Sequence, residues 1–296
     1  MKIVRVQNAT GSVQHYYHFF FAVLVPLLDL AFRGKNSGTH CIRTCGPMDA
    51  HLRSLMRADI FRLHILSKTQ MQIACMALPS SIVVPLLSEE LYEKRRKRAL
   101  AYDPGVLDRA RKIGLESLSS AVDSAEILQI RRGEPHVFYT SRKSEKAGKS
   151  AGASRRSIPN NDELHRGLEG LGFPVSQLTL EHMTLGQQVA AFSRARIVVA
   201  QHGAALSNIL WMTPGATVIE IIPADTKPYD HFSHLAEIAQ IRHVAIQQAS
   251  DHSPVDLKAV VSQVADSLER DPHSRRSAGD SSGGDRRLVD SRDCTA

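Results

Sequence analysis

One segment constrains the fold of this chain more than any other. Residues 197–200 form a short apolar run, and they lead directly into Gln201, His202 and the small residues 203–205. An apolar run followed at once by a small-residue helix start is typical of a buried strand in an α/β sheet. Such a turn exposes backbone N–H groups at the positive end of a helix, where phosphate binds readily. The segment therefore predicts an α/β fold with an anion site just after this strand.

The rest of the C-terminal half repeats the same alternation of strands and helices. Apolar runs that predict strands occur at residues 136–140, 175–180, 196–200 and 217–222. Segments that predict helices occur at residues 162–171, 185–194 and 204–212, with two closing helices at 231–240 and 256–268. Strands that alternate with single helices predict a parallel sheet with right-handed crossovers.

The N-terminal half shows a shorter version of this pattern. A strand is expected at residues 3–6, a helix at 16–32, and further strands around Cys41, Leu63, Ile73 and Val83. The charged segment 89–125, broken at residues 103–105, is expected to be helical and to form a hinge between the halves. At 296 residues, two domains are expected, at 1–125 and 126–270. The Ser-, Gly-, Asp- and Arg-rich tail at 271–296 is expected to be disordered.

The charge of the chain favours an anionic ligand without choosing among the classes of ligand. The formal net charge is +7, and part of the excess lies in the run 94–98. No interleaved aromatic residues or zinc-ligand spacing accompany this run, so a solvated helix face is favoured over a nucleic-acid site. Contact with anionic lipid head groups at the membrane surface remains an alternative for it.

Cysteine content and hydropathy indicate the cellular compartment. Four cysteines at irregular spacing do not predict a disulfide scaffold. The apolar stretch 19–28 is shorter than the roughly 20 residues that span a membrane, so a buried helix is expected there. No basic segment followed by an apolar run and a cleavage site opens the sequence. These features lead us to expect a cytoplasmic protein, with peripheral membrane contact as an open alternative.

Several motifs taken together resemble glycosyltransferase family 61. The signature block is carried by residues 202–208, 211–215 and 218–223. Outlying parts of the pattern agree with it in order: Ser141, Arg142 and Lys143, then Arg155 and Arg156 with Asn160, then Gln188, and at the N-terminus residues 16–19, Pro26 and 45–47. This resemblance implies a GT-B fold of two Rossmann-like domains with mainly parallel sheets. It also implies an inverting transfer from a nucleotide sugar, UDP-linked by family habit, that is held by the C-terminal half.

The resemblance and the residue chemistry together define a candidate donor site. No Asp-x-Asp occurs in the chain, so the usual carboxylate pair that holds a divalent ion on a diphosphate is missing. Cationic side chains and a helix end would then stabilise the departing diphosphate, and no metal or other cofactor is expected. The candidate donor-binding residues are Arg142, Arg155, Arg156, Asn160, Gln188, His202, Gly203, Ala204, Ser207, Asn208 and Glu220.

Each of these assignments has a simpler structural alternative. Gly203 and its neighbouring alanines could serve only close helix–strand packing, with His202 as a hydrogen-bonded turn residue. The arginines could be solvated loop charges. Glu220 could accept hydrogen bonds from ribose hydroxyls, or it could be a structural acceptor inside the protein.

A general base must also deprotonate the acceptor hydroxyl. His18 is the candidate, because it begins an apolar helix and histidine titrates near neutrality. A buried hydrogen-bonding role is the alternative for His18, and Asp29 is the reserve candidate. Asp230, His231 and His234 could suggest a metal site, but helix capping by Asp230 accounts for them more simply.

These expectations combine into one functional reading of the sequence. The chain is expected to be a metal-independent, inverting hexosyl- or pentosyltransferase that uses a nucleotide sugar and a glycan or glycoconjugate acceptor. Nucleic acid is not expected as a partner. The rival interpretation is a catalytically degenerate nucleotide- or glycan-binding protein of the same fold.

Overall fold

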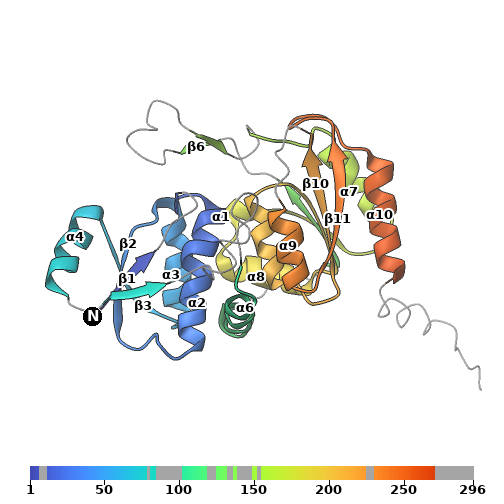
Figure 1. The fold of residues 1–296 in the computed structure, drawn as a ribbon. Helices are drawn as coiled ribbons and strands as arrows, with labels where there is room; N and C mark the ends of the chain where they lie inside the picture. Colours follow the sequence, from blue (N-terminus) through green and yellow to red (C-terminus); the bar gives the residue numbers. More distant parts are fainter. Residues whose placement is uncertain are drawn as a thin grey trace, which may run out of the picture.

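Two parallel β-sheets, one in each half of the chain, form the framework of the protein in this computed structural model (Figure 1). The structure describes residues 1–6, 12–78, 81–84, 102–118, 125–131, 136–138, 149–151, 155–224 and 230–270. The expected α/β fold with mainly parallel sheets is confirmed. The two-domain GT-B arrangement, its boundary at 125/126 and the disordered tail stay predictions, and the tail lies outside the described residues.

The N-terminal sheet has four parallel strands in the order β3-β2-β1-β4. Their bounds are β1 Lys2–Val6, β2 Thr39–Arg43, β3 Arg62–Leu66 and β4 Ser81–Val84. Between them run α1 (Tyr16–Phe19), the π-helical turn η1 (Phe20–Leu24), α2 (Val25–Phe32), η2 (Gly46–Met48), α3 (Asp49–Arg57) and α4 (Lys68–Ala77). The strands expected at 3–6 and around Cys41, Leu63 and Val83 are confirmed. The strand expected around Ile73 is wrong, because a capping box of Ser67 and Gln70 starts α4 there.

The C-terminal sheet has five parallel strands in the order β11-β10-β9-β5-β8. Their bounds are β5 Ile127–Arg131, β8 Val175–Thr179, β9 Ile197–Gln201, β10 Thr217–Pro223 and β11 Arg242–Gln248. Its helices are α7 (Asn161–Glu169), η5 (Leu180–His182), α8 (Leu185–Arg194), η6 (Ala204–Trp211), α9 (His231–Ile238) and α10 (Leu257–Arg270). After β5 the chain adds β8 on one side of that strand and then returns to add β9 on its other side. The carboxyl ends of β5 and β9 therefore form a topological switch point.

The structure differs from the sequence pattern of this half in three places. The strand expected at 136–140 is β6 (His136–Phe138), which pairs in antiparallel fashion with β7 (Lys149–Ala151) and stands outside the main sheet. The sheet uses β5 instead, and its edge strand β11 was not expected, because its half-exposed residues lack an apolar run. The segment expected as a helix after β9 is the 3₁₀-helix η6 rather than an α-helix.

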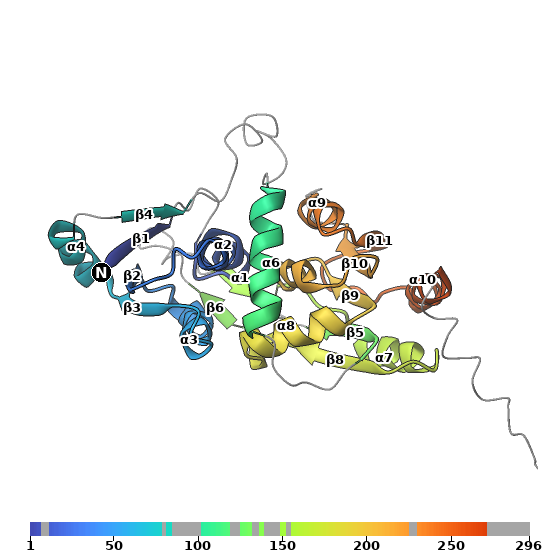
Figure 2. The same cartoon turned by 90° about the horizontal axis from the view of Figure 1, so that it is seen from below.

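The long helix α6 (Pro104–Leu118) lies between the two halves (Figure 2). Pro104 opens it, and the Asp103 carboxylate accepts a hydrogen bond from the Val106 N–H at 3.1 Å, so the expected break marks a helix start. The Trp211 ring packs directly on Gly114, where a Cβ atom would lie 2.6 Å from the ring. Because of this close approach, α6 packs against the core to which both halves contribute.

The apolar segment expected to form a buried helix does so. The expected helix at 16–32 is confirmed as the continuous run α1, η1 and α2, and residues Phe19–Leu28 are buried in the shared core. Phe20 lies edge-on to Trp211 of the C-terminal half, with ring centroids 5.5 Å apart. Among the described residues, none of the helices combines the length and the apolar character needed to cross a bilayer.

Candidate functional site

The segment after β9 ends at the carboxyl edge of the C-terminal sheet, at the switch point. All five residues of β9 are buried, and its neighbours are β5 and β10. His202, which follows the last strand residue Gln201, is buried as well, whereas residues 203–205 are partly exposed. A ligand that approached this edge would therefore meet the small residues at the start of η6 and the backbone that leads into them.

Glu220 holds the His202 side chain in place from the neighbouring strand β10. The Nδ1 atom of His202 lies 2.5 Å from Glu220 Oε1, and His243 Nε2 on β11 lies 2.7 Å from Glu220 Oε2. Glu220 is 2% exposed and His202 is 7% exposed. Burial by itself raises the pKa of Glu220, but the hydrogen bonds and charges of the two histidines outweigh it and leave the pKa below its ordinary value. Glu220 is thus an ionised acceptor between two imidazoles.

This geometry bears on the expected role of Glu220 toward a ribose. Both carboxylate oxygens are engaged inside the protein, and the side chain is almost fully buried. The structural alternative is therefore favoured for Glu220. With Nδ1 donating to a carboxylate, the tautomer of a neutral His202 is fixed, so that Nε2 is its acceptor atom.

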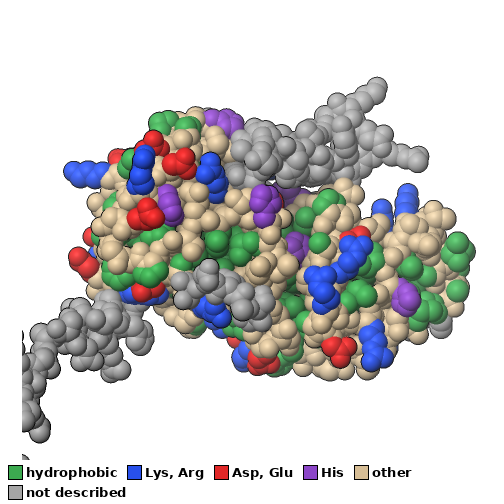
Figure 3. Space-filling view, turned by 180° about the vertical axis from the view of Figure 1, so that it is seen from behind, with side chains coloured by type: hydrophobic (Ala, Val, Ile, Leu, Met, Phe, Trp, Pro, Cys, Tyr) green, Lys and Arg blue, Asp and Glu red, His purple; other side chains and the backbone are tan. Residues whose placement is uncertain are grey.

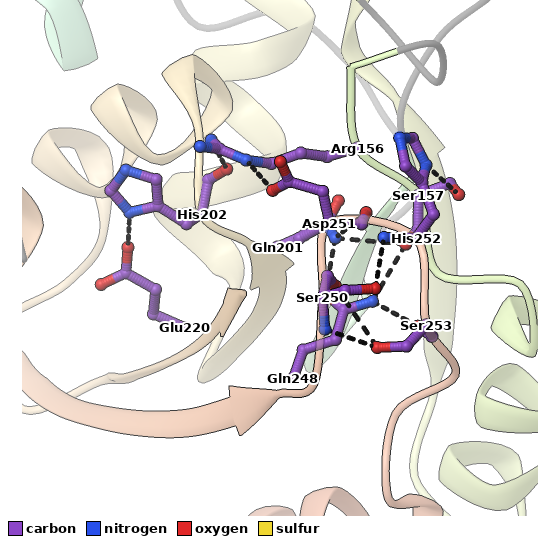
Figure 4. A network of polar contacts seen from close by, with 10 residues as sticks. All are labelled: Arg156, Ser157, Gln201, His202, Glu220, Gln248, Ser250, Asp251, His252 and Ser253. Carbon is purple, nitrogen blue, oxygen red and sulfur yellow. Dashed lines mark hydrogen bonds and ion pairs between the residues drawn. The ribbon is translucent and has the colours of Figure 1, made fainter. Parts of the chain in front are cut away.

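A second network fixes the backbone of the turn (Figure 4). Arg156 is buried, and its Nη1 donates to the His202 carbonyl oxygen at 3.1 Å, while its Nε pairs with Asp251 Oδ1 at 2.7 Å. Gln201 Nε2 donates to Gln248 Oε1 at 2.6 Å and to the Ser157 carbonyl oxygen at 3.2 Å. Three segments far apart in sequence therefore hold the turn at a single geometry.

The predicted arginines have separate outcomes in the structure. Arg156 is brought to the turn, but as a buried support for its backbone rather than as a solvated loop charge. The adjacent Arg155 is exposed beside it. Arg142 lies outside the described residues. The described strand that precedes it in the sequence, β6, belongs to the β6–β7 pair, and the donor role of Arg142 stays a prediction.

Three other predicted donor residues lie in a different place, under α1. Tyr16 OH lies 3.0 Å from both Gln188 Oε1 and Asn208 Oδ1, the two acceptors within reach of its single proton, and Trp211 Nε1 donates to Asn208 Oδ1. Burial raises the pKa of Tyr16 well above its ordinary range. Ser207 is fully buried in the same helix η6. These contacts join the two halves of the chain, and they give Gln188 and Asn208 a structural role at this interface.

Asn160 also has a structural partner. Its Nδ2 donates to the Val255 carbonyl oxygen and its Oδ1 accepts from the Val255 N–H, each at 2.9 Å. Both ends of the amide are used to hold the chain that leads into α10. The geometry therefore separates Asn160 from the turn at His202.

The two candidate bases have different environments. Asp29 is buried between α2 and α6, where it pairs with Arg109 Nε at 2.6 Å and Arg33 Nε at 3.0 Å. These ion pairs give Asp29 a structural role between α2 and α6, and its reserve role as a base stays a prediction. His18 is half-buried on α1, edge-on to the Tyr17 ring, and its role as a base stays a prediction.

A series of ring contacts leads from α1 to the turn. The Tyr17 ring lies 5.6 Å from the His231 ring and 6.0 Å from the Phe232 ring, and Phe232 lies 5.4 Å from His202. Histidine side chains are visible along the junction of the two halves in the view from behind (Figure 3). The site therefore lies where the N-terminal helix α1 meets the C-terminal sheet.

His231 and His243 are the residues that sequence reasoning missed. Burial, together with the positive charge of His202, lowers the pKa of His231, which is within electrostatic reach of both His202 and Glu220. The sequence drew attention to His231 only as a metal candidate beside Asp230 and His234. The structure gives Asp230 as the N-cap residue of α9, without a side-chain capping hydrogen bond. No sequence signal pointed to His243, because β11 itself was not expected.

Comparisons with known proteins decide the family. The family model described as Glycosyltransferase 61 matches residues 16–219, which is more than half of the chain. The chain belongs to glycosyltransferase family 61. It is 29% identical over 99 residues to a beta-1,2-xylosyltransferase of Arabidopsis thaliana, an alignment that covers 31% of this chain and 18% of the relative.

A second relative gives a similar picture. The chain is 32% identical over 95 residues to xylan glycosyltransferase MUCI21 of Arabidopsis thaliana, with 31% of this chain and 19% of the relative covered. The aligned part of this chain thus spans about a fifth of each plant relative. The family match includes α1, η6 and most of β10, so it contains His18, His202 and the N-terminal end of the Glu220-bearing strand.

Proposed function

We propose that this family 61 chain is an inverting glycosyltransferase that moves a sugar from a UDP-sugar to a glycan or glycoconjugate acceptor without a metal ion. The observation that carries the proposal is the His202 turn, held by Glu220 and Arg156 at the switch point of the C-terminal sheet. Open α/β sheets bind ligands outside the carboxyl ends of strands at such a point. The expected GT-B organisation, with donor and acceptor sides in different halves, fits the position of the turn beside α1.

The proposed donor site stabilises the charge that develops on the leaving diphosphate. The exposed Arg155, the backbone N–H groups at residues 203–204 and, in its protonated form, His202 Nε2 supply donors and positive charge toward this group. Glu220 holds the His202 ring in position at the turn through its hydrogen bond to Nδ1. We place Arg142 in the same role on the basis of the family resemblance, although its segment lies outside the described residues.

The proposed chemistry is a single displacement at the anomeric carbon. The acceptor oxygen forms a bond to that carbon, the bond from the carbon to the diphosphate oxygen breaks, and the configuration inverts. The acceptor proton passes to a base on the opposite side of the sugar, which we assign to His18. His231 is the other imidazole near the junction of the halves, and its lowered pKa keeps it neutral and able to accept a proton.

Nucleotide binding is the first test of this proposal. Thermal unfolding is measured with UDP, GDP, CMP and dTDP and their common sugars, with and without EDTA. A nucleotide at about 100 times its dissociation constant stabilises the native state by about 2.7 kcal/mol, or roughly 5 °C for a chain of this size. We expect such a shift with uridine nucleotides, unchanged by EDTA and lost in His202→Ala.

A matched control for this measurement is His64→Ala, which removes an exposed histidine from β3 in the other half. It is expected to keep the full shift. The absence of a shift with every nucleotide would overturn the donor site. A shift that EDTA abolishes would overturn the metal-independent mechanism.

Turnover separates a transferase from a binding protein and tests the base. Once the donor is identified, we expect His18→Ala to lower kcat for sugar transfer by about 100-fold or more while the nucleotide shift stays unchanged. His231→Ala is measured in parallel. Intact turnover in His18→Ala together with lost turnover in His231→Ala would identify His231 on α9, rather than His18, as the base. Nucleotide binding without any transfer or hydrolysis by the wild-type chain would favour the degenerate binding protein.

A further inference from the structure

The helix α4 covers the outer face of the N-terminal sheet, opposite α2 and α3 (Figure 2). Met71, Ala74, Cys75 and Leu78 recur at helical spacing and are half-buried, so they form the side of the segment that faces the sheet. None of the residues of α4 is fully buried. The helix is therefore attached to the sheet by one side, and its other side lies on the surface.

That other side carries two exposed large apolar side chains among polar ones. Ile73 is 57% exposed and Met76 is 81% exposed, and residues three apart on a helix lie on the same side. Met1, which is 68% exposed, precedes β1, and its sulfur lies 3.9 Å from the sulfur of Cys41 on β2. Most of the exposed large hydrophobic side chains of the described residues thus belong to α4 and the adjacent chain start.

Basic side chains lie on the same outer side of the sheet as these apolar residues. Val4, Ile42 and Leu63 point into the shared core, so their neighbours Arg5, Arg43 and Arg62 point to the outer face, since side chains alternate along a strand. All three arginines are exposed. Lys68 at the start of α4 is exposed as well, and the four strands and α4 contain no Asp or Glu. We call the surface formed by these four basic residues with Met1, Ile73 and Met76 the α4 face.

We propose that the α4 face binds the surface of an anionic lipid membrane. Exposed apolar side chains on the same face as exposed basic ones match both parts of such a surface, because the apolar side chains enter the head-group region while the cations meet anionic lipids. A second copy of the chain is a poor occupant, since it would bring two basic surfaces together. A nucleic acid would leave Ile73 and Met76 without an apolar partner. This inference does not rest on the proposed catalytic function.

Vesicle sedimentation tests the proposal directly. The full chain is mixed with vesicles of phosphatidylcholine alone or of phosphatidylcholine with phosphatidylserine. We expect binding to the anionic vesicles to be stronger by about tenfold or more and to weaken as salt is raised. The double variant Ile73→Glu/Met76→Glu is expected to lose binding by at least a similar factor. Met56→Glu is the matched control, because Met56 is also an exposed methionine but lies on α3.

Several outcomes would overturn this assignment. Equal binding to both vesicle types, no binding at all, or full binding by the double variant would each remove the α4 face as a lipid surface. Loss of vesicle binding in Met56→Glu as well would show a general effect of added charge and would also count against it. A concentration-dependent increase in mass by light scattering, abolished in the double variant, would identify self-association instead. The nucleotide shift is expected to be unchanged in the double variant, which separates this test from that of the donor site.

Discussion

Replacing Glu220 with glutamine is expected to lower turnover with the identified donor by about 10- to 100-fold. The carboxylate accepts from His202 at 2.5 Å and from His243 at 2.7 Å, and both bonds are charge-assisted when the imidazoles are protonated. Hydrogen bonds to charged groups contribute about 1.5–3 kcal/mol, which corresponds to that range of rates. Glutamine keeps the shape of the side chain but removes the negative charge that strengthens the hydrogen bond to the His202 ring. The measurement is kcat and the affinity for the nucleotide in both proteins.

The pH dependence of the free energy of unfolding distinguishes a role of the Glu220 charge from a role of its side chain in packing alone. The pKa of Glu220 is lowered in the folded protein, so its ionised form contributes stability above the ordinary pKa of about 4.5. That contribution is lost as the pH falls through the folded-state pKa, because the protonated carboxyl resembles the neutral amide. The difference in free energy of unfolding between wild type and Glu220→Gln is therefore expected to be largest near neutrality and to shrink in acid. Unchanged turnover in a folded Glu220→Gln protein would show that Glu220 does not act through His202.

Replacing Asp29 with asparagine is expected to lower the free energy of unfolding by about 3 kcal/mol. Asp29 is buried where α2 meets α6, and its two oxygens pair with Arg109 and Arg33. Removal of one partner from a buried ion pair commonly costs about 3–5 kcal/mol, because the remaining charge is left unpaired. The partly exposed Arg109 and Arg33 can turn toward solvent, which places the expected loss at the lower end. Denaturant unfolding monitored by Trp211 fluorescence measures it.

Asp108→Asn is the matched control on the same helix. Asp108 pairs with Lys112 at 3.0 Å, but both side chains are exposed, so the expected loss is below about 0.5 kcal/mol. The Asp29→Asn variant is expected to unfold at a lower temperature than the wild type. Nucleotide is expected to raise that temperature by the same amount as in the wild type. A loss of turnover without any loss of stability would instead favour Asp29 as the base.

Both predictions depend on contacts between segments that are distant in the sequence. The sequence singled out Glu220 and His202 separately, but it gave no sign that the two side chains are partners, and it did not single out His243. His202 lies 18 residues away and His243 lies 23 residues away, on a strand whose polar pattern gave no strand signal. Only the parallel pairing of β10 with β9 and β11 brings the three side chains together.

The same distinction applies to three other residues expected at the donor site. Gln188, Ser207 and Asn208 belong to helices that follow or precede the signature strand, and the family resemblance suggested a common ligand for them. The side chains of Gln188 and Asn208 instead meet Tyr16, a residue 172 and 192 positions away. A family motif can therefore include residues that bind a ligand and residues that only join one part of the protein to another.

The sequence by itself determined the α/β class, the family resemblance and the strand at 197–201 with the turn that follows it. These features follow from local patterns, because hydrophobic runs, helix caps and small-residue turns act over a few neighbouring positions. The tertiary structure decided which side chains support His202, that Arg156 holds the turn from inside, and that Asp29 is bound in an ion pair. These depend on strand order and on the packing of α6 between the halves, where residues about 20 to 200 positions apart come into contact. No short-range pattern encodes such contacts, since burial and charge pairing arise only after the chain has folded.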